Sequence, residues 1–202
     1  MNTIINIGRS FGSGGGYVGQ AVGKKLGIKV YDNELISKVA EESGYSAGIF
    51  ASGEEKRSLF SVSSFFASGR LSYLDSGYVN DNVMFKIQSD VIRRIASGGD
   101  AVIIGRCADY ILRDMDCLDV FVCAPMQYRI KRLMESENLS ADEAESLMRR
   151  KDRTRETYYN YYTFGAWGKA DNYDLCIDSS ILGIEGTADF IIDFGRRCGK
   201  IH

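Results

Sequence analysis

Histidine is almost absent from this sequence, and that absence excludes several kinds of chemistry. The 202 residues contain one histidine, His202. Nucleophilic catalysis by a Ser–His or Cys–His pair and histidine-based zinc chemistry both need an imidazole inside the fold. We therefore expect neither of them, and we predict no metal-binding residue set.

Cysteine pairs with metal-binding or redox spacing are also missing. The five cysteines are scattered, and no two of them form a C-x-x-C motif. Isolated cysteines in a reducing compartment most often pack as small apolar side chains. We expect that role, rather than disulfide formation or metal ligation, for Cys107, Cys117, Cys123, Cys176 and Cys198.

Long apolar runs and a strong net charge are missing as well. No run is long enough to span a bilayer, and no basic segment precedes the first predicted strand at Thr3, so no signal peptide is expected. A net charge of −2 argues against a general nucleic-acid or membrane-surface binder. We expect a cytoplasmic protein that binds neither.

What is present is the pattern of one α/β domain spanning residues 1–202. The hydrophobic content of 45% and charged content of 26% are ordinary for a globular protein of this length. Short apolar runs alternate with segments of helical periodicity, which indicates a doubly wound parallel sheet. The five strands are expected at 3–8, 28–31, 101–104, 118–123 and 173–177, and the helices include 79–97 and 184–194.

The loop after the first strand is the most informative segment. Glycine-rich turns between a strand and a helix let backbone N–H groups surround a phosphate, although glycine clusters also serve ordinary turns. The lysine of the usual G-x-x-x-x-G-K-[ST] motif is missing, because Gly15 stands in its place. The candidate phosphate-binding residues are Gly12, Ser13, Gly14, Gly15 and Gly16.

Charged side chains follow other predicted strands or gather in one basic segment. Asp32 and Arg106 come directly after strands, and residues 149–155 hold five basic residues around one aspartate. Each has a simpler explanation: Asp32 as a helix N-cap, Arg106 in a structural salt bridge, and 149–155 as a solvated helix face. The tyrosines at 158–162 are interpreted as packing rather than as a platform for a base. Because ligands of such sheets bind beyond the carboxyl ends of the strands, the set together favours a nucleotide site.

These segments resemble the cytidylate kinase-like family, a branch of the P-loop nucleoside monophosphate kinases. The resemblance covers nearly the whole chain and rests on residues 7–15, 26–28, 31–36, 104–112, 151–155, 158–159, Trp167 and 172–179. It implies a five-stranded parallel sheet, a helical monophosphate-binding insertion at 44–78 and an arginine-bearing lid at 140–168. It also implies ATP and Mg²⁺ as cofactors and a small-molecule nucleotide as the binding partner.

The resemblance assigns roles by position. The loop Gly12–Gly16 would hold the donor phosphates, Asp32 would lie near the acceptor phosphate and magnesium, and Arg106 would grip the acceptor phosphate. Arg149 and Arg155 would close over the transferring group, and together with Arg106 they would be the catalytic residues. Two positions depart from true cytidylate kinases, because Gly15 replaces a lysine and Tyr17 replaces a hydroxyl residue. Arg9 or a lid arginine is our hypothesis for the substitute cation.

Three functions stay open at this point. The first is an ATP-dependent kinase acting on a nucleoside monophosphate such as CMP, and the second is a catalytically degenerate nucleotide- or anion-binding protein on the same fold. The third is a kinase for another small acceptor. Phenylalanines in the insertion, Phe60, Phe65 and Phe66, could form an oligomer interface as easily as a substrate pocket.

Overall fold

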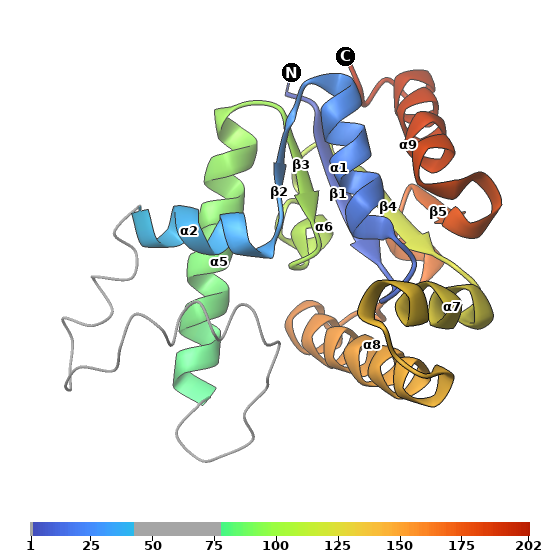
Figure 1. Cartoon of the computed structure of the whole chain (residues 1–202). Coiled ribbons are helices and arrows are strands. Elements are labelled where there is room, and N and C mark those ends of the chain that lie inside the picture. Colours follow the sequence, from blue (N-terminus) through green and yellow to red (C-terminus); the bar gives the residue numbers. More distant parts are fainter. Residues whose placement is uncertain (1, 43–77) are drawn as a thin grey trace.

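The computed structural model of the protein describes residues 2–42 and 78–202, and its centre is a parallel β-sheet (Figure 1). The described strands lie in the order β2-β3-β1-β4-β5, which confirms the predicted doubly wound α/β fold. Their bounds are β1 (Ile4–Arg9), β2 (Lys29–Tyr31), β3 (Ala101–Ile104), β4 (Leu118–Cys123) and β5 (Leu175–Asp178).

The central strand β1 is apolar because helices cover both faces of the sheet. Ile4 and Ile7 are almost completely buried although they point to opposite faces. In the sheet register, Ile7 lies beside Ile104 of β3 and Val120 of β4. The carboxyl ends of these three parallel strands therefore lie together at the same end of the sheet.

Five helices flank the sheet within the described residues. Against one face pack α1 (Gly15–Leu26) and α9 (Ser179–Arg197), and against the other pack α2 (Asn33–Glu42), α5 (Tyr78–Gly98) and α6 (Ala108–Ile111). Two more helices, α7 (Met126–Glu137) and α8 (Ala141–Thr163), pack on each other beyond the carboxyl ends of the strands (Figure 1). Their small core consists of Ile130, Leu133, Ala144 and Met148.

Several helix ends follow from the local chemistry of the chain. Gly27 ends α1 in a left-handed conformation with φ +69°, and Pro125 directly precedes α7. Ser140 and Glu143 form both hydrogen bonds of a capping box at the start of α8. The Asp32 carboxylate accepts a hydrogen bond from the Leu35 N–H at 3.0 Å, so the N-cap interpretation of Asp32 is also correct.

The C-terminal elements differ from the predicted ranges. The last strand begins at Leu175 rather than at 173, because the 3₁₀ turn η1 (Ala170–Asn172) holds the preceding chain and Tyr173 N–H donates to Ala170 O. The last helix begins at Ser179 rather than at 184. It is interrupted at Gly183 (φ +66°, ψ −175°), and the sequence pattern revealed only the part after this break.

The expectation of buried cysteines holds for Cys107 and Cys117 but is wrong for Cys176 and Cys198, which are exposed. Cys176 lies on β5, the last strand at one edge of the sheet, where one side has no neighbouring strand. All five cysteines are free.

Most of the predicted insertion at 44–78, including Phe60, Phe65 and Phe66, lies outside the described residues, and only its last residue, Tyr78, belongs to α5. None of the helices in the described ranges 2–42 and 78–202 is both long and apolar enough to cross a membrane.

Candidate phosphate-binding site

The glycine loop turns sharply between β1 and α1. Gly12 and Gly14 adopt φ values of +80° and +79°, a left-handed conformation that side chains disfavour. Ser13 is completely buried, and its hydroxyl donates to Ser10 O at 2.8 Å and to Val122 O at 3.0 Å. The Ser13 hydroxyl therefore stabilises the loop from within, while the glycines line the adjoining cavity.

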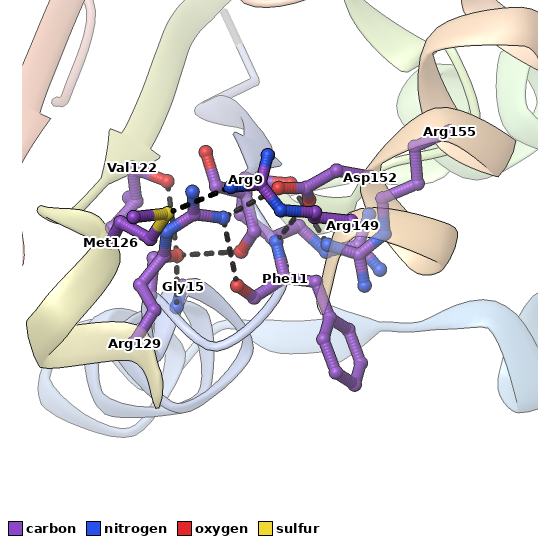
Figure 2. A network of polar contacts seen from close by, with 11 residues as sticks. Arg9, Phe11, Gly15, Val122, Met126, Arg129, Arg149, Asp152 and Arg155 are labelled. Atoms are coloured by element: carbon purple, nitrogen blue, oxygen red, sulfur yellow. Dashed lines mark hydrogen bonds and ion pairs between the residues drawn. The ribbon is translucent and has the colours of Figure 1, made fainter. Parts of the chain in front are cut away.

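Hydrogen bonds connect the loop to helices α7 and α8 (Figure 2). Phe11 N–H donates to Asp152 Oδ1 at 2.7 Å, and Arg129 Nη1 donates to Phe11 O at 3.2 Å. Arg129 and Asp152 form an ion pair, and Arg155 Nη1 donates to Arg9 O at 3.0 Å. Asp152 and Arg155 thus connect α8 to the loop, so the basic segment at 149–155 is more than a solvated face.

A cavity of about 450 Å³ opens beside the loop. It brings together the predicted residues Arg9, Arg155 and Asp32 with most of the glycine loop. Arg132 of α7 and Glu34 of α2 add one charge of each sign. The full lining consists of Arg9, Ser10, Phe11, Gly12, Gly14, Gly15, Gly16, Tyr17, Gln20, Asp32, Asn33, Glu34, Ile104, Arg132, Leu133, Ser136, Glu137 and Arg155.

Arg9 extends from the end of β1 into this cavity. Burial, together with the guanidinium groups of Arg155 and Arg106, lowers the pKa of Arg9 to about 9, and the Asp32 carboxylate acts in the opposite direction. Among the described residues its guanidinium forms no hydrogen bond and no ion pair. The cavity therefore holds a cation that the surrounding protein stabilises poorly.

Arg106 follows β3 in an unusual backbone conformation. Gly105, Arg106 and Cys107 have successive φ values of +75°, +61° and +55°, and left-handed conformations in non-glycine residues cluster at functional sites. The buried Gln88 amide donates to Arg106 O at 3.1 Å, and the guanidinium lies 6.0 Å from the centre of the Tyr158 ring. Burial lowers the pKa of Arg106, which Tyr158 counteracts.

Arg149 does not join the residues that line the cavity. Its exposed guanidinium pairs with Glu145 at 2.7 Å, one helical turn earlier, and contacts Met126 Sδ. In this structure Arg149 therefore lies on the surface of α8, whereas Arg155 reaches the loop.

The tyrosines that follow the basic segment pack against neighbouring helices. The Tyr162 ring stacks on Phe85 of α5 with centroids 4.0 Å apart, and the Tyr159 hydroxyl donates to Asp109 of α6 at 2.7 Å. Burial raises the pKa of Asp109, while the Tyr159 hydrogen bond opposes that shift. These contacts fasten the carboxyl-terminal half of α8 to the domain, in agreement with the packing interpretation.

Sequence reasoning missed Arg132, the strongest new candidate. Its guanidinium carbon lies 5.1 Å from the centre of the exposed Tyr17 ring and would lie 3.1 Å from a Cβ at position 14. Arg129, which holds the loop, was missed as well, and Asp152 was noted only as the one aspartate of the basic segment, with no role in holding the loop. The packing of α7 on α8 brings Arg129 and Arg132 to the loop, and neither belongs to a local motif.

The described part of the site offers few side chains that could bind a divalent cation. Within the described residues, no group of three or more acidic, histidine or cysteine side chains is arranged to hold a metal ion. Asp32 and Glu34 nevertheless line the cavity, and Mg²⁺ at nucleotide sites commonly uses one or two carboxylates together with phosphate oxygens.

Comparison with known proteins gives consistent results for sequence and fold. A cytidylate kinase from Pyrococcus horikoshii is 25% identical over 189 residues, covering 91% of this chain and 83% of that protein. A cytidylate kinase from Sulfolobus acidocaldarius is 27% identical over 108 residues, which cover 53% of this chain, and the match spans 59% of the length of that relative.

Solved structures agree on the fold. An uncharacterized protein from Eubacterium ventriosum superposes with a TM-score of 0.69 at 27% identity, covering 95% of this chain and 96% of that one. Shikimate kinase from Bacteroides thetaiotaomicron shares the fold with a TM-score of 0.54 at 12% identity, covering 97% and 99%.

The family match extends over nearly the whole chain. The sequence pattern of the cytidylate kinase-like family matches residues 4–181, which include the glycine loop, Asp32, Arg106 and the arginines of α8. The sheet order is that of P-loop kinase structures. The chain therefore belongs to the cytidylate kinase-like family.

Proposed function

We propose that this protein is a phosphotransferase that binds ATP and transfers its γ-phosphoryl group to a nucleoside monophosphate. The observation that carries the proposal is the meeting of Arg9 and Arg155 with the glycine loop and Asp32 around one cavity. Phosphoryl transfer needs positive charge and positioning around the transferring group rather than covalent chemistry by the protein. This cavity offers both.

The amino terminus of α1 supports binding of the donor phosphates. Its first turn contains no acidic residue, and its N-cap residue, Gly14, has no side chain, while the Gly15 N–H donates to the Ser13 hydroxyl at 3.3 Å. The partial positive charge of a helix amino terminus favours an anion there, and the glycines allow close approach of the backbone.

Mg²⁺ would neutralise part of the phosphate charge. Asp32 is the residue best placed to hold it, with Glu34 as a second carboxylate at the same cavity. One Asp32 oxygen accepts the Leu35 N–H, and within the part of the chain that the structure describes the other oxygen could bind the ion.

Arg106 supports an acceptor subsite next to the cavity. It lies close enough to Arg9 for the two charges to repel, and its strained turn is held by Gln88. We propose that Arg106 binds the phosphate of the acceptor and that Arg155 contacts the transferring group. Arg149 would contact the transferring group only if α8 moved toward the cavity. Such a movement is what we expect of a lid formed by residues 140–168.

A second function is favoured by one specific observation. Gly15 stands at the lysine position, and a side chain there would collide with Arg9. The alternative is a nucleotide- or anion-binding protein without turnover. A kinase for another small acceptor remains a variant of the first proposal, and either kinase would use the cytoplasmic ATP pool.

A coupled assay of ADP release separates these functions. The full chain would be supplied with ATP and Mg²⁺, and CMP, dCMP, UMP, AMP and GMP would be offered in turn, while calorimetry measures ATP binding in parallel. We expect ATP binding and turnover with at least one monophosphate. Binding of ATP without turnover for any acceptor would favour the non-catalytic alternative, and absence of nucleotide binding would refute both.

Arg106→Gln provides a test of the acceptor subsite in the same assay. We expect a rise in the KM for the monophosphate while ATP binding stays unchanged. Arg197→Gln on α9, where the arginine is exposed and paired with Asp193, removes the same charge far from the cavity and serves as the matched control.

A further inference from the structure

We infer that Arg9, at the end of β1, is the residue that grips the donor phosphates, in place of a lysine on α1. The inference rests on the proposed function, because it names the cation of the same site. It selects one of the two substitutes that the sequence leaves open, and the selection comes from the geometry of a slot between two glycines.

The first wall of the slot is Gly15. A Cβ at position 15 would lie 2.5 Å from Arg9 Cβ and 3.1 Å from Arg9 Cγ, and also 3.1 Å from Val122 Cβ. A Cβ atom essentially never lies within 3.0 Å of another heavy atom, so the 2.5 Å approach to Arg9 Cβ cannot occur unless Arg9 shifts. The stem of Arg9 therefore occupies the space that a side chain at position 15 would need, and no lysine can be accommodated there while Arg9 keeps this position.

The second wall of the slot is Gly105, directly after β3. A Cβ at position 105 would lie 1.8 Å from Arg9 Nη1 and 2.9 Å from Arg9 Cζ. The φ value of +75° at Gly105 also favours glycine. The two glycines thus leave a channel from α1 to the end of β3, and the guanidinium of Arg9 lies at its far end.

The charges around this guanidinium call for an anion. Arg155 and Arg106 repel it, and Asp32 is the carboxylate that attracts it. Since Arg9 forms no hydrogen bond or ion pair through its guanidinium within the described residues, its donors remain available. A planar guanidinium binds phosphate oxygens through two parallel hydrogen bonds and keeps its charge better than an amine.

Arg155 is less suited to be the main phosphate ligand. One of its donors is used by Arg9 O at 3.0 Å, and its guanidinium carbon lies 5.2 Å from the centre of the Phe11 ring. Arg155 therefore holds the backbone of Arg9 in place and adds charge. It is a positioning residue for Arg9 in the resting structure.

The ligand class that fits is a polyphosphate chain. Arg9 would bind one end, and the amino terminus of α1 and the glycine loop would surround the other, since all of them line the same cavity. Inorganic tripolyphosphate contains this chain without a base, a sugar or an acceptor, so its binding does not depend on turnover.

The test compares tripolyphosphate binding by calorimetry, at constant ionic strength and without Mg²⁺, for the full chain and three variants. Arg9→Gln keeps a long side chain in the slot but removes the charge, and Arg9→Lys keeps the charge but removes the planar fork. Arg197→Gln is the matched control for net charge. Urea unfolding of each variant verifies that it is folded.

We expect Arg9→Gln to weaken tripolyphosphate binding by about tenfold or more, because a charge-assisted hydrogen bond is lost. Arg9→Lys should lie between the wild type and Arg9→Gln, and Arg197→Gln should bind as the wild type does. Equal binding by Arg9→Gln and the wild type would overturn the inference, as would an equal loss in Arg197→Gln. If the kinase assay fails while these differences in binding appear, the proposed function is refuted and the role of Arg9 stands. If turnover survives Arg9→Gln, the proposed function stands and the role of Arg9 is refuted.

Discussion

Asp119 carries a charge that the folded state disfavours, and neutralising it should stabilise the protein in a pH-dependent way. The residue lies in β4 beside the central strand, where Asn6 Nδ2 donates to its Oδ1 at 2.7 Å. Burial raises the pKa of Asp119 to about 6, with contributions in the same direction from Asp109 and Asp174. The Asn6 hydrogen bond and Lys200 act against this rise.

The magnitude follows from the two pKa values. An aspartate in an unfolded chain titrates near pH 3.9, so the folded value is higher by about two units, and each unit corresponds to about 1.4 kcal/mol. The folded state binds this proton more tightly, so stability falls as pH rises from about 4 to about 6 and stays lower above that range. Ionised Asp119 therefore costs about 3 kcal/mol at neutral pH.

Asp119→Asn removes the charge and keeps an oxygen for Asn6 to donate to. The substitution leaves the hydrogen bond that Asn6 Nδ2 donates in place. At pH 7.5 we expect the free energy of unfolding to rise by about 3 kcal/mol, and near pH 4 we expect the variant and the wild type to differ by less than about 1 kcal/mol.

Urea unfolding followed by tryptophan fluorescence measures this difference. The single tryptophan, Trp167, packs edge-on against Phe121 of the same strand with centroids 5.5 Å apart, so it reports on this part of the sheet. Asp193→Asn, at an exposed carboxylate of α9 paired with Arg197, is the control. A gain in Asp119→Asn that is equal at both pH values, or no gain at pH 7.5, would refute the reasoning.

Three other substitutions test the loop and its supports. Gly15→Ala should lower the free energy of unfolding by about 1–3 kcal/mol in urea, and adding Arg9→Gly should restore part of it, because the new Cβ would meet the arginine stem. Asp152→Asn leaves the Arg129 charge without its partner and should cost about 3 kcal/mol, with faster hydrogen exchange at Phe11 N–H. Ser140→Ala removes the cap of α8 and should cost about 1 kcal/mol in thermal unfolding followed by circular dichroism. Losses of similar size in Arg197→Gln would contradict all three.

Features that depend on neighbours in sequence were predictable. The buried strands at 101–104 and 118–123 follow from uninterrupted apolar residues, and the ends of helices at Gly27 and Ser140 follow from cap chemistry. The family resemblance likewise rested on contiguous motifs, and the family match confirms it.

Features that depend on contacts between distant segments were not predictable. Cys176 resembles a residue of a buried strand, but it is exposed because β5 lies at the edge of the sheet. The family resemblance gave Arg149 and Arg155 the same role, yet only Arg155 reaches the loop. Arg132 belongs to a helix with no motif, and its position at the cavity appears only when α7 packs beside the glycine loop.

The sequence by itself determined the class of fold, the family and the rim of the sheet where a phosphate would bind, because strand periodicity, caps and glycine turns act over a few residues. Only the tertiary structure decided which cations lie at that rim. Positions 15 and 9 lie six residues apart in the chain, and the link between them is steric. A side chain at position 15 and the stem of Arg9 would need the same space between α1 and β4. This exclusion becomes visible only when the elements are packed.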